Sequence, residues 1–336
     1  MLEKPDLSDQ LIITAVQAEY ELDVCHVTFL PLGYDINTAV YRIDTTDGTA
    51  YFLKLRKGSF DPIMVLVPQF LSGLGLQAII PPLKCHTGQL FGSCRVYTTI
   101  LYPFIPGKDG YQVKLTEAQW IELGRSLKMV HTANIPPHLS ALISHEAYDP
   151  QWRQSVKHFQ AQIEKDNYDD PVAVKLSKFL ETRQKQISHM LKRADQLAEQ
   201  LKQQAGEVVL CHTDAHPGNY LITDGGELYL VDWDNPIFAC KERDLMFFGS
   251  GMIGSLPGGQ EENWFYQGYG AVEIDQKALT YYRYERIIQD IAEFCKQIFL
   301  TAGGEDRIQS YKYLLSSFDP GYEVDAAFQT DPSSMI

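Results

Sequence analysis

The chain has 336 residues, which is longer than one ordinary domain and sufficient for two. Hydrophobic residues make up 45% and charged residues 21%, a globular balance that excludes a largely disordered chain. Acidic residues number 43 against 29 basic ones, giving a formal net charge of −14. So acidic a chain lacks the basic surface that a general nucleic-acid-binding protein needs.

The distribution of cysteines and of apolar residues indicates the cellular compartment of the protein. The six cysteines are scattered and form no C-x-x-C pair, which is typical of a protein in a reducing cytoplasm. The first residues contain no apolar secretory segment, and no apolar stretch is long enough to span a bilayer. We therefore expect a cytoplasmic protein that binds neither nucleic acid nor membrane, and the sequence indicates no protein partner.

The first hundred residues have the pattern of strands with one or two helices. Residues 39–43 and 49–55 are β-rich runs on either side of Asp47-Gly48, a strong hairpin signal. Apolar residues alternate along the second run, so Lys54 is expected to face away from its two leucine neighbours.

A helix is predicted next, over residues 63–74, an apolar segment that contains Pro68. Two further strands are expected, one near Leu90 and one over residues 95–101, separated by Gly92. This order of elements favours an antiparallel sheet with a helix against it over an array of βαβ units.

The strand pattern ends at residues 102–107, because two prolines and a glycine there cannot continue a central strand or a helix. Beyond this break the pattern is helical. A capping box at Thr116 begins a helix that runs to Asn134, and another helical pattern extends from 170 to 206, long enough that we expect a break. A further helix is expected around residues 281–299.

Three short strands interrupt the helical part, over residues 208–211, 220–223 and 227–231. The last two are expected to pair across the Asp224-Gly225-Gly226 turn. The polar residues between and after these strands carry the candidate chemistry.

Asp214 lies in the loop after the first of these strands, Asn219 follows five residues later, and Asp232 ends the last strand. Phosphoryl transfer from a nucleotide needs a carboxylate to orient and deprotonate the attacking hydroxyl, and two oxygen ligands for Mg²⁺. Mg²⁺ takes only a few protein oxygens beside phosphate oxygens, so one amide and one carboxylate suffice. The spacing therefore predicts a phosphoryl-transfer site.

The loop from His212 to Asn219 resembles the catalytic loop of protein-kinase-like enzymes, in the form carried by aminoglycoside phosphotransferases and choline-kinase-type small-molecule kinases. Asp232-Trp233-Asp234 stands where protein kinases have Asp-Phe-Gly. Within this family, the chain most resembles the spectinomycin phosphotransferase type. The segments that carry this resemblance are residues 102–105, 241–247, 266–270 and 281–287.

The resemblance implies an α+β, protein-kinase-like fold with two lobes. An antiparallel-sheet, nucleotide-binding lobe would span residues 1–101, a hinge 102–107, and a mainly helical lobe for catalysis and substrate binding 108–336. ATP and Mg²⁺ are the implied cofactors, with Asp214 as the catalytic base and Asn219 and Asp232 as metal ligands.

The resemblance also implies which residues hold the nucleotide. Lys54 would contact the phosphates, and the adenine would lie near Tyr102, Phe104 and Ile105. The family pairs this lysine with an acid on the next helix, but residues 63–74 contain none and Asp61 is the nearest. The phosphate loop over residues 32–38 has one glycine instead of a glycine-rich motif.

The implied acceptor is a cationic small molecule: an aminoglycoside or aminocyclitol, and for this type spectinomycin. Its ammonium groups would meet acids, for which Asp234, Glu285 and Asp290 are candidates. Asp234 could equally be a second metal contact or a loop acid. His212 and His216 are expected to have structural roles at the loop, and Glu242 and Asp244 to organise either the loop or helix packing. Cys211 is expected to pack as a small apolar residue.

Two other functions stay open. The chain could be a metabolic kinase of an amino alcohol such as choline, ethanolamine or homoserine, with the same fold. It could also be a non-catalytic kinase-like binding protein, although the intact catalytic residues argue against this.

Overall fold

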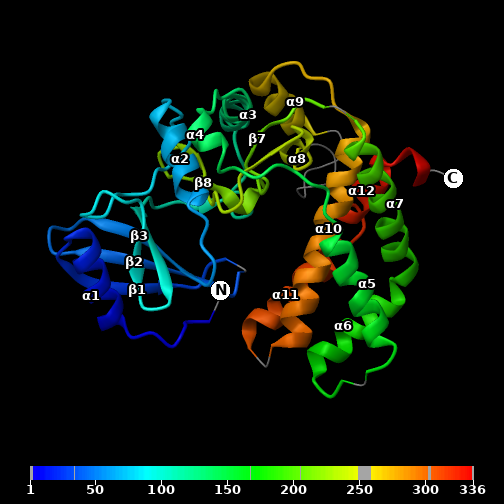
Figure 1. The fold of residues 1–336 in the computed structure, drawn as a ribbon, viewed down its shortest axis with the longest axis horizontal. Coiled ribbons are helices and arrows are strands. Elements are labelled where there is room, and N and C mark those ends of the chain that lie inside the picture. The colour runs from blue at the N-terminus through cyan, green and yellow to red at the C-terminus, as the bar shows by residue number, and fades with distance from the viewer. Residues whose placement is uncertain are drawn as a thin grey trace. The chain divides into compact units, whose positions relative to one another are not determined.

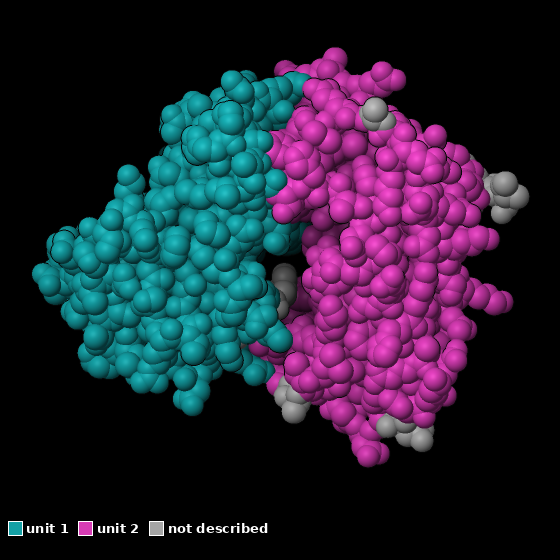
Figure 2. Space-filling view, in the orientation of Figure 1, with its two compact units in different colours: residues 1–143, 214–236 teal, residues 144–213, 237–336 magenta. Residues whose placement is uncertain are grey.

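The computed structural model describes residues 3–33, 35–166, 168–204, 206–248, 259–301 and 304–334. The chain divides into two compact units, one of residues 1–143 with 214–236 and one of residues 144–213 with 237–336 (Figure 2). The predicted lobes divide the chain at 102–107 instead, and that division stays a prediction. Tyr34 of the predicted phosphate loop lies outside the described residues.

Unit 1 contains an antiparallel sheet of five strands in the order β1-β2-β3-β5-β4. The strands are β1 (Val24–Leu30), β2 (Thr38–Thr45), β3 (Ala50–Lys57), β4 (Gly92–Cys94) and β5 (Tyr97–Pro103). The predicted hairpin is confirmed as β2–β3, with Asp44 opposite Ala50. The prediction that Gly92 separates two strands is wrong, because Gly92 pairs with Thr99 as the first residue of β4. The break between β4 and β5 falls instead at the turn in which Arg95 has φ 55°.

The two faces of this sheet have different partners. Helix α1 (Asp9–Tyr20) covers one face (Figure 1), where Leu53 and Leu55 of β3 belong to its apolar cluster. Helix α2 (Ile63–Gly73) forms, as predicted, with Pro68 inside it, and its Val65 clusters with Ile100 of β5. Lys54 pairs with Ile100 across the sheet and so points away from the leucine cluster, as predicted.

A three-stranded sheet joins residues 214–236 to unit 1. Its order is β6 (Lys108–Asp109), β8 (Tyr220–Ile222) and β9 (Leu228–Leu230), and the predicted pairing of the last two strands is confirmed. Helix α3 (Glu117–His131) begins at the predicted capping box, and Gln119 donates from Nε2 to the Gly226 oxygen at 3.0 Å. Leu230 N also donates to the Ala78 oxygen at 2.8 Å, so the segment carrying Asp214 and Asp232 is held by N-terminal residues. The short helix α4 (Pro137–Ser140) completes the unit.

Unit 2 is built around α10 (Gln276–Leu300), which α5 (Gln151–Ile163) and α7 (Gln184–Lys202) accompany along its length (Figure 1). The predicted break in the 170–206 pattern falls at Arg183, between α6 (Pro171–Thr182) and α7. The other elements are β7 (Val209–Cys211), β10 (Ile237–Ala239), α8 (Glu242–Leu245), α9 (Gln260–Tyr269), α11 (Glu305–Ser317) and α12 (Glu323–Thr330). Among the described residues, no helix is long and apolar enough to cross a membrane.

An ion pair ties the C-terminal end of the described chain to α7. Arg193 donates from Nε and Nη2 to the two carboxylate oxygens of Asp331 at 2.7 and 2.9 Å, and Ser333 N donates to the same group at 3.0 Å. Asp331 is fully buried. Burial alone would raise its pKa, but the hydrogen bonds from Arg193 and Ser333 outweigh it and lower the pKa to about 2.

This carboxylate should make stability depend on pH. Because the pKa of Asp331 is lower in the folded chain than its ordinary value of 3.8, its contribution is present above pH 4 and is lost as the pH falls toward 2. The size of the shift corresponds to about 2 kcal/mol. Urea unfolding should find Asp331→Asn less stable than the parent protein at pH 7 by about this amount, with a smaller gap at pH 3. A gap that stays constant between the two pH values would contradict the assignment.

Candidate active site

The ammonium group of Lys54 lies between two carboxylates. Its Nζ donates to Oδ1 of Asp232 and to Oδ1 of Asp234, each at 2.5 Å. The Lys54 side chain is only 9% exposed, so its charge depends on these partners. The structure thus supplies the partner that the sequence left open: it is the segment after β9, and Asp61 instead accepts from the backbone N of Ile63.

Asp234 also contacts a second cation of β3. Arg56 donates from Nη1 to Asp234 Oδ2 at 2.8 Å and lies 3.6 Å from Asp35 Oδ2. Lys54 and Arg56 are two residues apart on one strand and therefore share a face of the sheet. Sequence analysis missed Arg56, although its alternation with Lys54 was the signal that could have found it.

These charges shift one another's pKa values. Burial would lower the pKa of Lys54, but Asp232 and Asp234 more than offset it and raise the pKa above its ordinary value. Enclosure by protein raises carboxyl pKa values, yet the Lys54 ammonium outweighs this at Asp232 and lowers its pKa. At Asp234, burial and the charge of Asp232 together raise the pKa to about 6.

Asp214 and Asn219 contact each other within the loop between β7 and β8. Asn219 donates from Nδ2 to the Asp214 backbone oxygen at 2.8 Å and to Asp214 Oδ2 at 3.2 Å. Asn219 is buried, whereas the Asp214 side chain is 36% exposed. The amide therefore orients a carboxylate that solvent or an acceptor can reach.

His216, one of two histidines in this loop, also contacts Asp214. His216 accepts the Gly218 N–H at Nδ1, at 3.0 Å, and its Nε2 lies 3.5 Å from Asp214 Oδ2. The predicted structural role of His216 is confirmed by the first of these contacts, which caps the short turn Pro217–Asn219.

The donor atoms at this site fit a hard cation. Because Nδ2 of Asn219 donates to Asp214, its Oδ1 is the amide atom that could ligate a metal. Asp232 is 44% exposed and contacts Lys54 through Oδ1, so its carboxylate remains accessible. One amide oxygen and one carboxylate are the ligands that Mg²⁺ prefers in nucleotide sites.

The backbone turns sharply at Asp232, where φ is 68°. Few residues other than glycine adopt this left-handed conformation, and Asp is among those that tolerate it. The next residue, Trp233, is buried and donates from Nε1 to the Leu230 oxygen at 3.0 Å. The turn thus buries the tryptophan while presenting Asp232 to Lys54.

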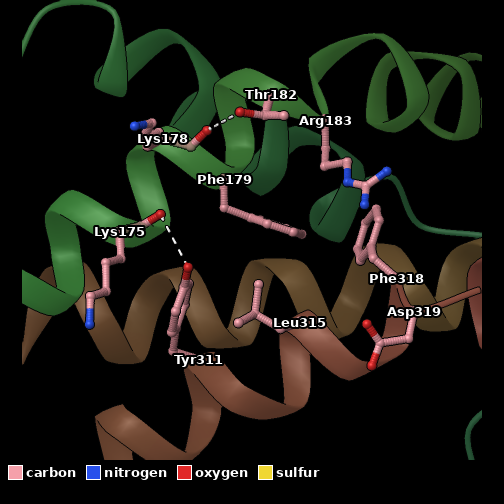
Figure 3. Close-up of a pocket in the computed structure, with 9 residues that line it drawn as sticks. All are labelled: Lys175, Lys178, Phe179, Thr182, Arg183, Tyr311, Leu315, Phe318 and Asp319. Atoms are coloured by element: carbon pink, nitrogen blue, oxygen red, sulfur yellow. Dashed lines mark hydrogen bonds between the residues drawn. The ribbon is translucent and has the colours of Figure 1, made fainter.

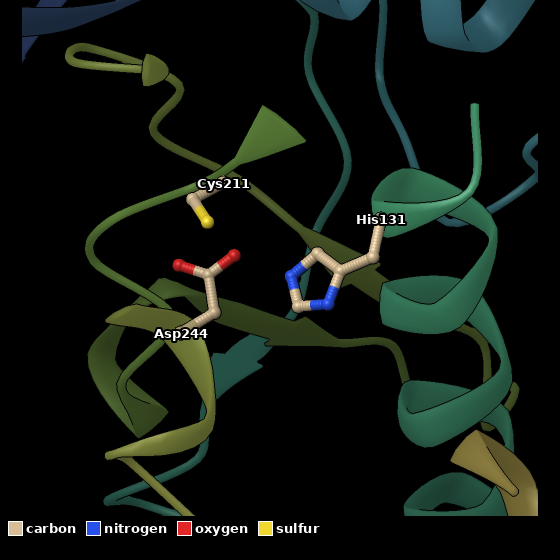
Figure 4. Close-up of side chains that lie close together, drawn as sticks. All are labelled: His131, Cys211 and Asp244. Carbon is tan, nitrogen blue, oxygen red and sulfur yellow. The ribbon is translucent and has the colours of Figure 1, made fainter. Parts of the chain in front are cut away.

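Asp244 of α8 organises the chain just before Asp214, as predicted. Its two carboxylate oxygens accept the backbone N–H groups of His212 and Thr213 at 2.8 and 2.6 Å. Thr213 has φ 75°, so these bonds hold a strained residue in place. Cys211 lies beside Asp244 (Figure 4) and is fully buried, as predicted for a small packed side chain. Burial raises the pKa of its thiol well above the ordinary value.

The predicted hinge residues lie at the end of β5 and after it. Tyr102 is opposite Phe52 of β3, and their ring centroids are 6.5 Å apart. Phe104 N donates to the Ala50 oxygen at 3.1 Å, and the Arg42 guanidinium lies 4.7 Å from its ring centroid. Tyr102 and Phe104 are half-buried, as is Ile105.

The other two acceptor candidates lie on α10 of unit 2. Glu285 is buried and accepts from Arg153 Nη1 at 2.5 Å. Burial raises its pKa to about 7, although Arg153 opposes this. The placement does not support an acceptor contact at Glu285, because its carboxylate is engaged inside the unit. Asp290 is partly exposed and pairs with Arg286 at 3.1 Å.

Unit 2 also contains a hollow of about 400 Å³ between α6 and α11 (Figure 3). Phe179 and Phe318 meet edge to face in it, with centroids 5.1 Å apart, and Tyr311 donates to the Lys175 oxygen. Its lining includes none of the predicted site residues.

Comparison with known proteins identifies relatives of the whole chain. The model of the phosphotransferase enzyme family, APH, matches residues 28–235. Spectinomycin phosphotransferase APH(9)-Ia, crystallised with ADP and spectinomycin, is 33% identical, with 97% of this chain and 99% of that chain covered and a TM-score of 0.88. Choline kinase LicA from Streptococcus pneumoniae is 15% identical over 95% of this chain and 99% of its own, with a TM-score of 0.55, a likeness of fold alone. The predicted α+β, kinase-like fold is confirmed.

The hydrogen bonds from His212 and Thr213 to Asp244 can be tested by amide hydrogen exchange. Asp244→Asn retains one acceptor oxygen in place of two charged ones, so at least one of these amides should exchange about tenfold to a hundredfold faster. Asp275→Asn is the matched control, because Asp275 caps α10 through the Lys277 and Ala278 amides. Unchanged exchange at both loop amides in Asp244→Asn would refute the role of Asp244.

Proposed function

The chain belongs to the phosphotransferase enzyme family, and on that premise we propose that it transfers the γ-phosphoryl group of ATP to a hydroxyl group of spectinomycin or a closely similar aminocyclitol. Family membership makes the chain a phosphotransferase that acts on an alcohol group. The observation that supports the acceptor is the 33% identity, over 97% of the chain, to an enzyme whose structure holds ADP and spectinomycin.

In this proposal Asp214 orients the acceptor hydroxyl and takes up its proton as the oxygen attacks phosphorus. Its exposed carboxylate suits this task, and the hydrogen bond from Asn219 fixes its direction. A positioned base of this kind typically contributes about 10²- to 10⁴-fold to the rate.

Asn219 and Asp232 would hold Mg²⁺ through the amide oxygen and the carboxylate. When bound, the ion supplies positive charge to the phosphate oxygens, whose negative charge must be stabilised during transfer. Lys54 would contribute a further positive charge to the same phosphates from β3.

The adenine would lie near Tyr102, Phe104 and Ile105. Tyr102 and Phe104 present aromatic rings, and all three residues are half-buried at the end of β5 or just after it, which suits a planar apolar base. Ring contacts of Tyr102 with Phe52 and of Phe104 with Arg42 hold the two side chains in place.

Two of the three acids expected to contact the acceptor already have cationic partners inside the protein. Glu285 is committed to Arg153, and Asp234 to Lys54 and Arg56, so neither is the first choice for an ammonium group. Asp290 stays a proposed contact, because its side chain is partly exposed. An amino-alcohol kinase is the second candidate, favoured by the likeness in fold to choline kinase.

The roles of Asp214 and Asp232 predict different defects. Asp214→Ala should lower kcat by about 10²- to 10⁴-fold while the dissociation constant for Mg-ATP stays nearly unchanged, because the residue contacts the acceptor. Asp232→Ala should instead lose the Mg²⁺-dependent part of ATP binding, since a carboxylate ligand is removed. Steady-state kinetics and calorimetric titration with and without Mg²⁺ distinguish the two. Turnover by Asp214→Ala within about tenfold of the parent enzyme would refute the base.

The acceptor is tested directly by product analysis. Purified protein, ATP and Mg²⁺ are incubated with millimolar spectinomycin, choline or ethanolamine, and mass spectrometry measures the gain of one phosphoryl group. We expect phosphorylated spectinomycin, and none with Asp214→Ala. Turnover of choline or ethanolamine without any spectinomycin product would favour the amino-alcohol kinase. Nucleotide binding without any product would favour a non-catalytic protein.

A further inference from the structure

Helix α2, on which the sequence comparison expects an acidic partner for Lys54, contains no acidic residue. Helix α2 has the sequence Ile-Met-Val-Leu-Val-Pro-Gln-Phe-Leu-Ser-Gly, without an acidic residue. Lys54 is nevertheless buried, and a buried ammonium without a counter-charge is strongly disfavoured. The compensating charge must therefore come from elsewhere in the chain.

We propose that Asp234 is the positioning residue for Lys54 and that Arg56 in turn holds Asp234. This pairing would replace the acid that α2 lacks. The inference rests on the proposed phosphoryl transfer, because it assigns Lys54 to the phosphates of the nucleotide.

The geometry of Asp234 is that of a bridge between two cations of one strand. Its Oδ1 accepts from Lys54 at 2.5 Å and its Oδ2 from Arg56 at 2.8 Å, so both oxygens are engaged. The side chains of Arg56 and Asp234 are 19% and 22% exposed. A bridge enclosed to this degree is screened less by salt than a surface pair and can fix the direction of both side chains.

Asp232 and Asp234 differ in the exposed fraction of their side chains, and we assign them different roles on that ground. Asp232 contacts Lys54 through Oδ1 alone and is 44% exposed, twice the fraction of Asp234. The more open carboxylate is the one suited to a metal ion, and the more enclosed one is suited to holding the lysine. This division argues against Asp234 as an acceptor contact or as a second metal ligand.

The bridge extends to the loop before β2. Arg56 lies 3.6 Å from Asp35 Oδ2, and Asp35 accepts from the Asn37 backbone N and the Thr38 hydroxyl, both at 2.8 Å. Negatively and positively charged side chains thus alternate from Asp35 through Arg56 and Asp234 to Lys54. Arg56 therefore connects the positioning of Lys54 to the predicted phosphate loop.

The test separates the three roles open to Asp234 by kinetics. If it positions Lys54, Asp234→Ala should lower kcat and raise KM for ATP, with a combined loss of about a hundredfold in kcat/KM, while KM for the acceptor stays unchanged. Asp234→Glu, which retains the charge, should recover part of this loss. A rise in the acceptor KM alone would assign Asp234 to the acceptor. A rise in the Mg²⁺ requirement alone would assign it to the metal. Either result would overturn the proposal.

Arg56 is tested by a double-mutant cycle. Because Arg56 acts through Asp234, the double variant Arg56→Ala/Asp234→Ala should be no slower than Asp234→Ala alone, whereas independent roles would multiply the two losses. Lys57→Gln is the matched control, because Lys57 is exposed on the same strand and loses the same charge. Multiplying losses, or an equal loss in Lys57→Gln, would overturn the role of Arg56.

A readout without turnover keeps this inference separate from the proposed function. In the metal-free, nucleotide-free protein, the shifts in the urea-unfolding midpoint caused by Arg56→Ala and Asp234→Ala should be non-additive. Additive shifts would contradict the bridge itself. Failure of the parent enzyme to phosphorylate any acceptor would contradict the proposed function, and the unfolding cycle would still decide whether the bridge exists.

Discussion

The burial of the Lys54 ammonium is the constraint on which the site depends. A charge with so little exposed surface requires fixed counter-charges, and here both come from the segment after β9. That segment must consequently be held against β3. The β6-β8-β9 sheet and the hydrogen bond from Leu230 to Ala78 provide this attachment within unit 1. The fold thus satisfies an electrostatic requirement by means of backbone pairing.

The same backbone pairing places the other polar residues. The loop that carries Asp214 and Asn219 runs directly into β8, and the left-handed turn at Asp232 follows β9. Asn219 and Val231 are joined by a backbone hydrogen bond of 2.9 Å, so the loop and the segment after β9 are adjacent. One short stretch of chain therefore presents a proposed base and two proposed metal ligands, and one strand presents the lysine proposed to bind phosphate. The proximity of Asp214, Asn219 and Asp232 follows from pairing within this stretch, whereas that of Lys54 depends on the attachment of the stretch to unit 1.

Features with local causes were predictable from the sequence, and those with distant causes were not. The β2–β3 hairpin follows from Asp47-Gly48 and the start of α3 from its capping box, since each depends on a few neighbouring residues. The partners of Lys54 lie 178 and 180 residues away, beyond the reach of any local pattern. The pairing of Glu285 with Arg153 could not be predicted for the same reason, because Arg153 lies 132 residues earlier, on α5. The attachment of residues 214–236 to unit 1 also depends on pairing across the sequence.

The central claim is that Lys54 is held by the acids after β9 while the nucleotide is bound. A crystal structure of the protein with a non-hydrolysable ATP analogue, Mg²⁺ and spectinomycin tests it most directly. The account predicts Lys54 Nζ in contact with both the phosphates and Asp234, the metal ion on Asn219 and Asp232, and an acceptor hydroxyl beside Asp214. A lysine paired with a different acid, or an Asp234 turned toward the metal or the acceptor, would contradict it.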